Sequence, residues 1–89
     1  MGWTVELDPK ALQDLDAIDR RETRRILRFL HERLALRDNP REVGEALQGS
    51  RFSGMWKYRV GNYRLVCEIQ DAEVTILVLR VGRRREIYR

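Results

Sequence analysis

The chain has 89 residues, of which 43% are apolar and 36% charged, with a net charge of +4. This length predicts one domain over residues 1–89, with a modest core. The composition favours a folded chain over a disordered one. No apolar run is long enough to cross a membrane, and the N-terminus lacks the pattern of a secretory signal. We therefore expect a cytoplasmic protein with no membrane partner.

Metal and cofactor chemistry finds little support in the composition. Cys67 is the one cysteine and His31 the one histidine, so an internal disulfide and the usual zinc sites are excluded. There is no glycine-rich phosphate-binding motif, and His31 lies in a helical pattern among charged residues. We expect no metal and no cofactor, and we expect Cys67 to be a small core residue.

The N-terminal half predicts a strand followed by two helices. Residues 3–7 alternate as a strand does, and Asp8-Pro9 then signals a helix running to about Ile18. Asp19 opens a second helix through a capping box with Glu22. Its apolar stripe is Ile26, Leu27, Leu30 and Leu34, and Asn39-Pro40 marks the end of the helix or lies just beyond it. We expect a helical hairpin, exposed carboxylates at Asp14, Asp16 and Asp19, and a connecting loop over 41–53.

The C-terminal half predicts three antiparallel strands. Met55–Val60 and Tyr63–Gln70 alternate on either side of Gly61-Asn62, a pair that suits a type II′ turn. A third strand, Glu73–Val81, follows an Asp71-Ala72 turn and is apolar on both faces, which is typical of a central strand. The fold class is therefore α+β: an N-terminal strand, a helical hairpin and an antiparallel three-stranded meander.

A two-residue turn fixes which side chains share a face. Arg59 then lies opposite Arg64, and both share one face with Lys57. If the next turn is Asp71-Ala72, Arg64 also neighbours Leu79, and Val81 and Arg83 continue along this basic face. The other face should be the core, with Trp56, Tyr58, Val60, Tyr63, Leu65, Cys67 and Ile69.

Positive charge concentrates on this part of the chain. Residues 1–53 carry ten basic and ten acidic residues, whereas residues 54–89 carry eight and four, so the entire net charge lies there. A positive field on rigid strands indicates a polyanionic partner. Two arginines directly opposite each other cost stability unless an anion bridges them.

Two motifs in this region carry a family resemblance. The hairpin Gly61-Asn62-Tyr63-Arg64 and the ending Val81-Gly82-Arg83-Arg84-Arg85-Glu86-Ile87-Tyr88 together resemble the RelE/ParE toxin superfamily of bacterial type II toxin–antitoxin systems. The likeness covers nearly the whole chain. It implies the RelE-like fold and a cytoplasmic, metal-free endoribonuclease that cuts mRNA on the ribosome and inhibits translation. It also implies a RelB-like protein antitoxin that neutralises the toxin.

The resemblance implies site residues as well. Catalytic roles fall to Lys57, Arg59, Arg64, Arg84 and Tyr88, and RNA-binding roles to Arg83, Arg85 and Arg89. Lys57 is the best candidate base because a lysine, unlike an arginine, can give up its proton when cations crowd it. Many relatives carry histidine at the place of Arg83, and the Glu/His pair of some relatives is expected to have no counterpart here.

Two other functions stay open at this point. The ParE branch of the same superfamily inhibits DNA gyrase instead of cutting RNA. A non-catalytic module that binds RNA or DNA through the basic face is the other alternative. The basic residues together with Tyr88 favour the ribonuclease.

Overall fold

The computed structural model describes residues 2–49 and 52–83. The chain begins with β1 (Thr4–Leu7), α1 (Pro9–Asp16) and α2 (Arg20–Arg28). A π-helical turn (Phe29–Leu34), a 3-10 turn (Pro40–Val43) and β2 (Glu45–Ala46) follow. The chain then forms β3 (Trp56–Val60), β4 (Tyr63–Gln70), a 3-10 turn (Asp71–Glu73) and β5 (Thr75–Arg83). The predicted α+β fold is confirmed.

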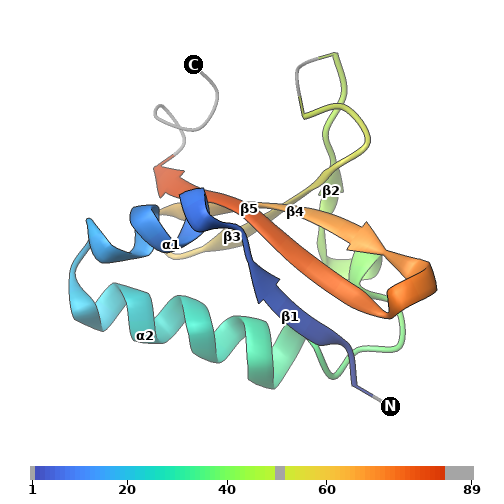
Figure 1. Cartoon of the computed structure of the whole chain (residues 1–89), viewed down its shortest axis with the longest axis horizontal. Coiled ribbons are helices and arrows are strands. Elements are labelled where there is room, and N and C mark those ends of the chain that lie inside the picture. The colour runs from blue at the N-terminus through green and yellow to red at the C-terminus, as the bar shows by residue number, and fades with distance from the viewer. Residues whose placement is uncertain (1, 50–51, 84–89) are drawn as a thin grey trace.

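The strands form a single five-stranded sheet in the order β1-β5-β4-β3-β2. β1 runs parallel to β5, and the other neighbouring strands pair antiparallel. Figure 1 shows α2 on one side of this sheet. β5 lies between two partners, as its apolar character on both faces predicted.

Local sequence signals explain where the helices begin. The backbone N–H of Lys10 donates to Asp8 Oδ2 (2.8 Å) at the start of α1, and that of Arg21 donates to Asp19 Oδ1 (3.1 Å) at the start of α2. α2 continues directly into the π-helical turn, where the Ala35 N–H donates to the Leu30 carbonyl (2.9 Å). The predicted helical hairpin is therefore present, although α1 ends two residues earlier than expected.

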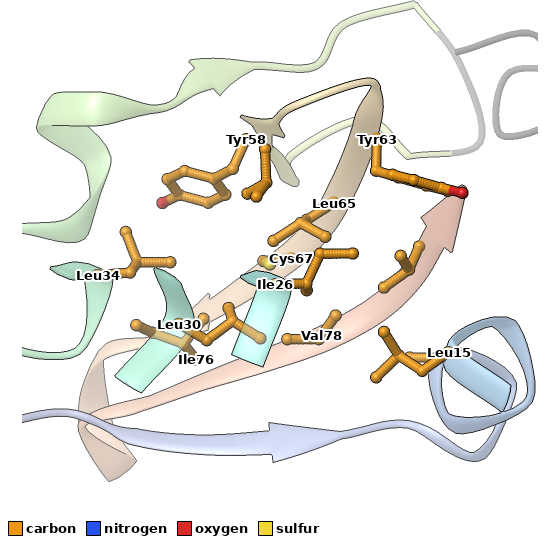
Figure 2. Close-up of a cluster of buried hydrophobic side chains, with 13 residues drawn as sticks. Leu15, Ile26, Leu30, Leu34, Tyr58, Tyr63, Leu65, Cys67, Ile76 and Val78 are labelled. Carbon is orange, nitrogen blue, oxygen red and sulfur yellow. The ribbon is translucent and has the colours of Figure 1, made fainter. Parts of the chain in front are cut away.

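The core lies between the helices and one face of the sheet. Figure 2 shows Ile26, Leu30 and Leu34 against strand residues that include Leu65 and Cys67. The predicted core face is confirmed for Tyr58, Val60, Tyr63, Leu65 and Cys67, which belong to this buried cluster, and for Trp56, which packs against it. Ile69 is half-buried and is not part of the cluster. Among the described residues, no helix is long and apolar enough to span a membrane.

The β3–β4 register is the predicted one. Val60 pairs with Tyr63, Arg59 with Arg64, and Lys57 with Val66. Gly61 has a φ of 59° whereas Asn62 has no positive φ, which fits a type II′ turn.

The predicted position of β5 was wrong in register. Arg64 pairs with Gly82 and not with Leu79. One reason is that the turn after β4 extends from Asp71 to Val74, two residues more than expected. The other is a bulge: Val78 pairs with Cys67 and Arg80 with Val66, which leaves Leu79 as an extra residue. An extra residue reverses the alternation, so beyond it Val81 and Arg83 lie on the helix side of the sheet.

Two smaller expectations were also wrong. The segment 41–53, predicted as a loop, contributes most of a 3-10 turn and the short edge strand β2. Asp14, predicted to be exposed, accepts hydrogen bonds from Arg80 Nε (2.9 Å) and from the backbone N–H of Val81 (2.9 Å). This carboxylate raises the pKa of Arg80 through the hydrogen bond between them.

Candidate active site

Three of the predicted site residues line one hollow on the face of the sheet away from the helices. Lys57 and Arg59 come from β3 and Arg64 from β4, and they share a space of about 250 Å³. Val43 and Glu45 complete its lining. We call this space the basic hollow. The hairpin register brings these side chains together because residues opposite each other in a ladder, and residues two apart on one strand, share a face.

Arg59 and Arg64 lie directly opposite each other in the ladder. Arg64 Nη1 donates a long hydrogen bond (3.4 Å) to the Tyr63 carbonyl, and Arg59 is exposed. Within residues 2–49 and 52–83, neither guanidinium forms an ion pair with a carboxylate. Each therefore keeps donors available for the oxygens of a phosphate.

Glu45 is a site residue that the sequence analysis missed. β2 pairs with β3 so that Glu45 lies opposite Lys57, and Lys57 Nζ lies 3.3 Å from Glu45 Oε2. The sequence analysis named no acidic residue at this site. No sequence signal marked it, because β2 has only two residues and lies in a polar segment.

The segment that carries Val43 and Glu45 is tied to the rest of the sheet. Arg41 donates two hydrogen bonds to the Asp71 carboxylate (3.0 and 2.6 Å), and its guanidinium lies 5.9 Å from the centre of the Trp56 ring. These hydrogen bonds raise the pKa of Arg41 and lower that of Asp71. Both contacts fix one side of the basic hollow.

Tyr58 anchors the same segment from the core. Its hydroxyl donates to the Pro40 carbonyl (2.9 Å), and the side chain is fully buried. Burial raises the pKa of Tyr58, so the hydroxyl stays protonated and remains a donor at physiological pH. Burial raises the pKa of the Cys67 thiol as well, which makes it an unreactive core residue, as predicted.

The tail residues do not all join this hollow. Arg83 lies 5.9 Å from the centre of the Tyr63 ring and lines a different hollow with Asp14 and Asp19, on the helix side. Its expected place on the basic face was wrong, because of the bulge at Leu79. The other predicted tail residues lie outside the described residues: Arg84, Arg85, Tyr88 and Arg89. In the part of the chain that the structure describes, no three His, Cys, Asp or Glu side chains gather as metal ligands would.

Comparison with known proteins identifies the family. A family model described as "ParE toxin of type II toxin-antitoxin system, parDE" matches residues 5–88. Toxin RelG of Mycobacterium tuberculosis is 33% identical over 89 residues, which cover all of this chain and 99% of that protein.

Solved structures agree with this assignment. The crystal structure of the toxin–antitoxin complex RelBE2 from Mycobacterium tuberculosis matches with a TM-score of 0.84 and 30% identity, covering 94% of this chain and 93% of that one. A double mutant of E. coli toxin RelE, in complex with a peptide of the antitoxin RelBc, matches with a TM-score of 0.73 and 26% identity. That match covers 99% of this chain and 92% of the other. The chain therefore belongs to the RelE/ParE superfamily and is a toxin of a type II toxin–antitoxin system.

Proposed function

We propose that this toxin is a metal-free endoribonuclease that cuts mRNA on the ribosome and so inhibits translation. The observation that carries the proposal is the basic hollow, where Lys57, Arg59, Arg64 and Glu45 converge. Cations and a proton acceptor in one exposed hollow are what metal-free cleavage of an RNA phosphate needs. The family assignment supports the toxin role on which the proposal builds.

The chemistry fits an attack by the neighbouring ribose. The 2′-oxygen forms a bond to phosphorus and gives its proton to an acceptor. The bond from phosphorus to the 5′-oxygen breaks, and that oxygen takes up a proton, leaving a 2′,3′-cyclic phosphate. Arg59 and Arg64 stabilise the negative charge that grows on the phosphate oxygens, a task at which preorganised donors contribute a few kcal/mol each.

Two side chains in the basic hollow suit the proton acceptor. Lys57 is the base that the sequence favoured. Glu45 adds a carboxylate 3.3 Å from the lysine, and it can take the proton directly while Lys57 helps to hold the phosphate. Of the tail residues, we assign Arg84 to charge stabilisation and Tyr88 to stacking on a base or orienting the 2′-OH. We assign Arg83, Arg85 and Arg89 to RNA binding.

We further propose that a RelB-like antitoxin neutralises the toxin in the cytoplasm. Support comes from two relatives that were solved in complex with their antitoxins. An acidic antitoxin segment placed over Arg59 and Arg64 would relieve the repulsion between the two guanidinium groups and block access to RNA.

Inhibition of DNA gyrase is the second candidate function. It is favoured by the family match, whose description names the ParE toxin. The basic hollow argues for the ribonuclease, because stalling an enzyme by binding requires no proton acceptor beside paired arginines.

A reconstituted assay distinguishes the candidates. Purified toxin is incubated with ribosomes programmed with a defined mRNA, and the 5′ ends of the RNA are mapped. In parallel, gyrase supercoiling is measured with the same toxin. Discrete cuts that require ribosomes support the proposal. Gyrase arrest without cuts supports the ParE alternative, and RNA retention without either supports a non-catalytic module.

A further inference from the structure

A second basic hollow lies between α2 and the β3–β4 turn. It has a volume of about 350 Å³, and four arginines line it: Arg25, Arg28, Arg33 and Arg59. We call it the arginine groove. Figure 1 shows α2 running beneath the sheet, and Phe29, Val60 and Gly61 also line the space.

The groove is strongly positive. Among the described residues, its one ion pair joins Arg28 Nε to Glu32 Oε2 at 3.8 Å, between two exposed side chains, and such pairs contribute little. In residues 2–49 and 52–83, Arg25, Arg33 and Arg59 form no ion pair. Like charges that line one hollow repel each other, and an anion placed between them relieves that repulsion.

The arrangement of Arg25 is supported by the turn. A Cβ added to Gly61 would lie 2.7 Å from Arg25 Nη1, so the guanidinium rests against the glycine backbone. A larger residue at this position would push it away. Gly61 thus serves two purposes, because its φ of 59° also makes the two-residue turn possible.

The positive charge of α2 does not appear in the net charge of residues 1–53, which is zero. Residues 1–19 have a net charge of −4, whereas residues 20–34 have +4. These two charges add up to zero, but they lie on different segments of the structure. α2 therefore provides a second positive surface, separate from the one on the strands.

The arginine groove and the basic hollow meet at Arg59, which lines both. Among the described residues, β2 pairs with only Trp56 and Lys57, so the rest of β3 has no strand partner on that side there. An extended polyanion bound in the basic hollow can continue past this edge toward α2 without crossing a strand.

We propose that the arginine groove is a non-catalytic subsite that holds backbone phosphates of RNA next to the cutting site. This inference rests on the proposed ribonuclease function and extends it beyond the basic hollow. Guanidinium groups donate paired hydrogen bonds to phosphate oxygens, and contacts of this kind bind RNA independently of sequence. The phosphates belong either to the mRNA that is cut or to ribosomal RNA beside it.

The test compares two double variants with equal loss of charge. Arg25→Gln/Arg33→Gln changes the groove, whereas Arg20→Gln/Arg24→Gln changes exposed arginines of the same helix that do not line it. The dissociation constant is measured across a series of salt concentrations, with a single-stranded RNA oligonucleotide and with ribosomes that carry no mRNA. Losing two phosphate contacts lowers the slope of log K against log salt by about 1.4 for single-stranded RNA.

A smaller slope for the groove variant, with the control unchanged, supports the subsite. A change with the oligonucleotide places the mRNA in the groove, and a change with ribosomes alone places ribosomal RNA there. Equal slopes for both variants overturn the inference, as does a loss of antitoxin binding with both RNA slopes intact. Cutting of ribosome-bound mRNA by the native toxin and by the control variant is measured separately. If neither cuts, the ribonuclease proposal fails, whatever the salt slopes show.

Discussion

Arg59 and Arg64 illustrate a conflict between stability and function. Two guanidinium groups opposite each other in a ladder destabilise a free hairpin, by roughly the few tenths to 1 kcal/mol that a cross-strand pair contributes. The same placement creates a preformed site for a phosphate. The side chains that would bind the anion are therefore already in position before it arrives.

Glu45 makes the sharpest prediction about proton transfer. Glu45→Gln keeps the size of the side chain but removes the acceptor, so the rate of the first turnover on ribosome-bound mRNA should fall at least tenfold. Quench-flow measurement of the cut mRNA provides this rate.

Glu42→Gln is the matched control, since Glu42 is an exposed glutamate in the same segment and does not line the basic hollow. It should leave the rate unchanged. If Glu45→Gln cuts at the native rate, Glu45 is not the acceptor and Lys57 remains the candidate.

The sequence predicted some of the site residues and not others, for a physical reason. Lys57, Arg59 and Arg64 were found because alternation and a two-residue turn determine their common face locally. Glu45 was missed because it reaches the site through a non-local pairing of a two-residue strand. The displacement of Arg83 was missed because one extra residue in β5 reverses every side chain beyond it.

Among the elements, most boundaries followed from local signals. Caps at Asp8 and Asp19 placed the helices, and apolar periodicity placed the core. The pairing of β1 with β5 was not predicted, since a parallel partner distant in sequence leaves no local pattern. The contact between α1 and β5 was not predicted either. There the Asp14 carboxylate accepts a hydrogen bond from the backbone N–H of Val81, a part of β5 that β1 does not reach.

Asp14 should therefore contribute to stability. Asp14→Ala leaves the Val81 N–H and the partly buried Arg80 without their partner, at a cost of about 1–3 kcal/mol in the free energy of unfolding. Urea unfolding followed by circular dichroism measures the loss. Asp16→Ala, on the same helix and exposed, should change stability by no more than about 0.5 kcal/mol. Equal effects of the two variants would show that the Asp14 contacts carry no net stability.

Gly44 lies between the buried Tyr58 ring and Glu45, which lines the basic hollow. A Cβ at this position would lie 2.8 Å from Tyr58 Cε1, and the Tyr58 ring is buried and held by its bond to the Pro40 carbonyl. Gly44→Ala should therefore lower the unfolding free energy by about 1–3 kcal/mol through overpacking. It should also reduce cutting, because the strain shifts the neighbouring Glu45.

Thermal unfolding and a cutting assay well below the transition temperature separate these two effects. Gly2→Ala is the control, because the added Cβ would meet its nearest atom, the Ala35 carbonyl oxygen, at an ordinary 3.6 Å. A Gly44→Ala protein with native stability and native activity would contradict the tight contact with Tyr58.

For the molecule as a whole, the two faces of the sheet have different roles. The face of the sheet toward α2 builds the core, and the opposite face presents the basic hollow. A rigid sheet with its core on one side holds charged side chains at fixed spacing on the other. The positively charged surface then continues through Arg59, at the edge of β3, onto α2.

Arg64→Ala provides the most direct test of the central claim that the basic hollow cuts mRNA. The variant is compared with the native toxin and with Arg20→Ala, an exposed change on α2, in single-turnover cleavage of ribosome-bound mRNA. We expect native folding, a melting temperature at or slightly above the native value, and a cleavage rate at least tenfold lower, equal to about 1.4 kcal/mol of transition-state stabilisation. Arg20→Ala should cut at the native rate. A folded Arg64→Ala protein that cuts at the full rate would contradict the assignment of the active site.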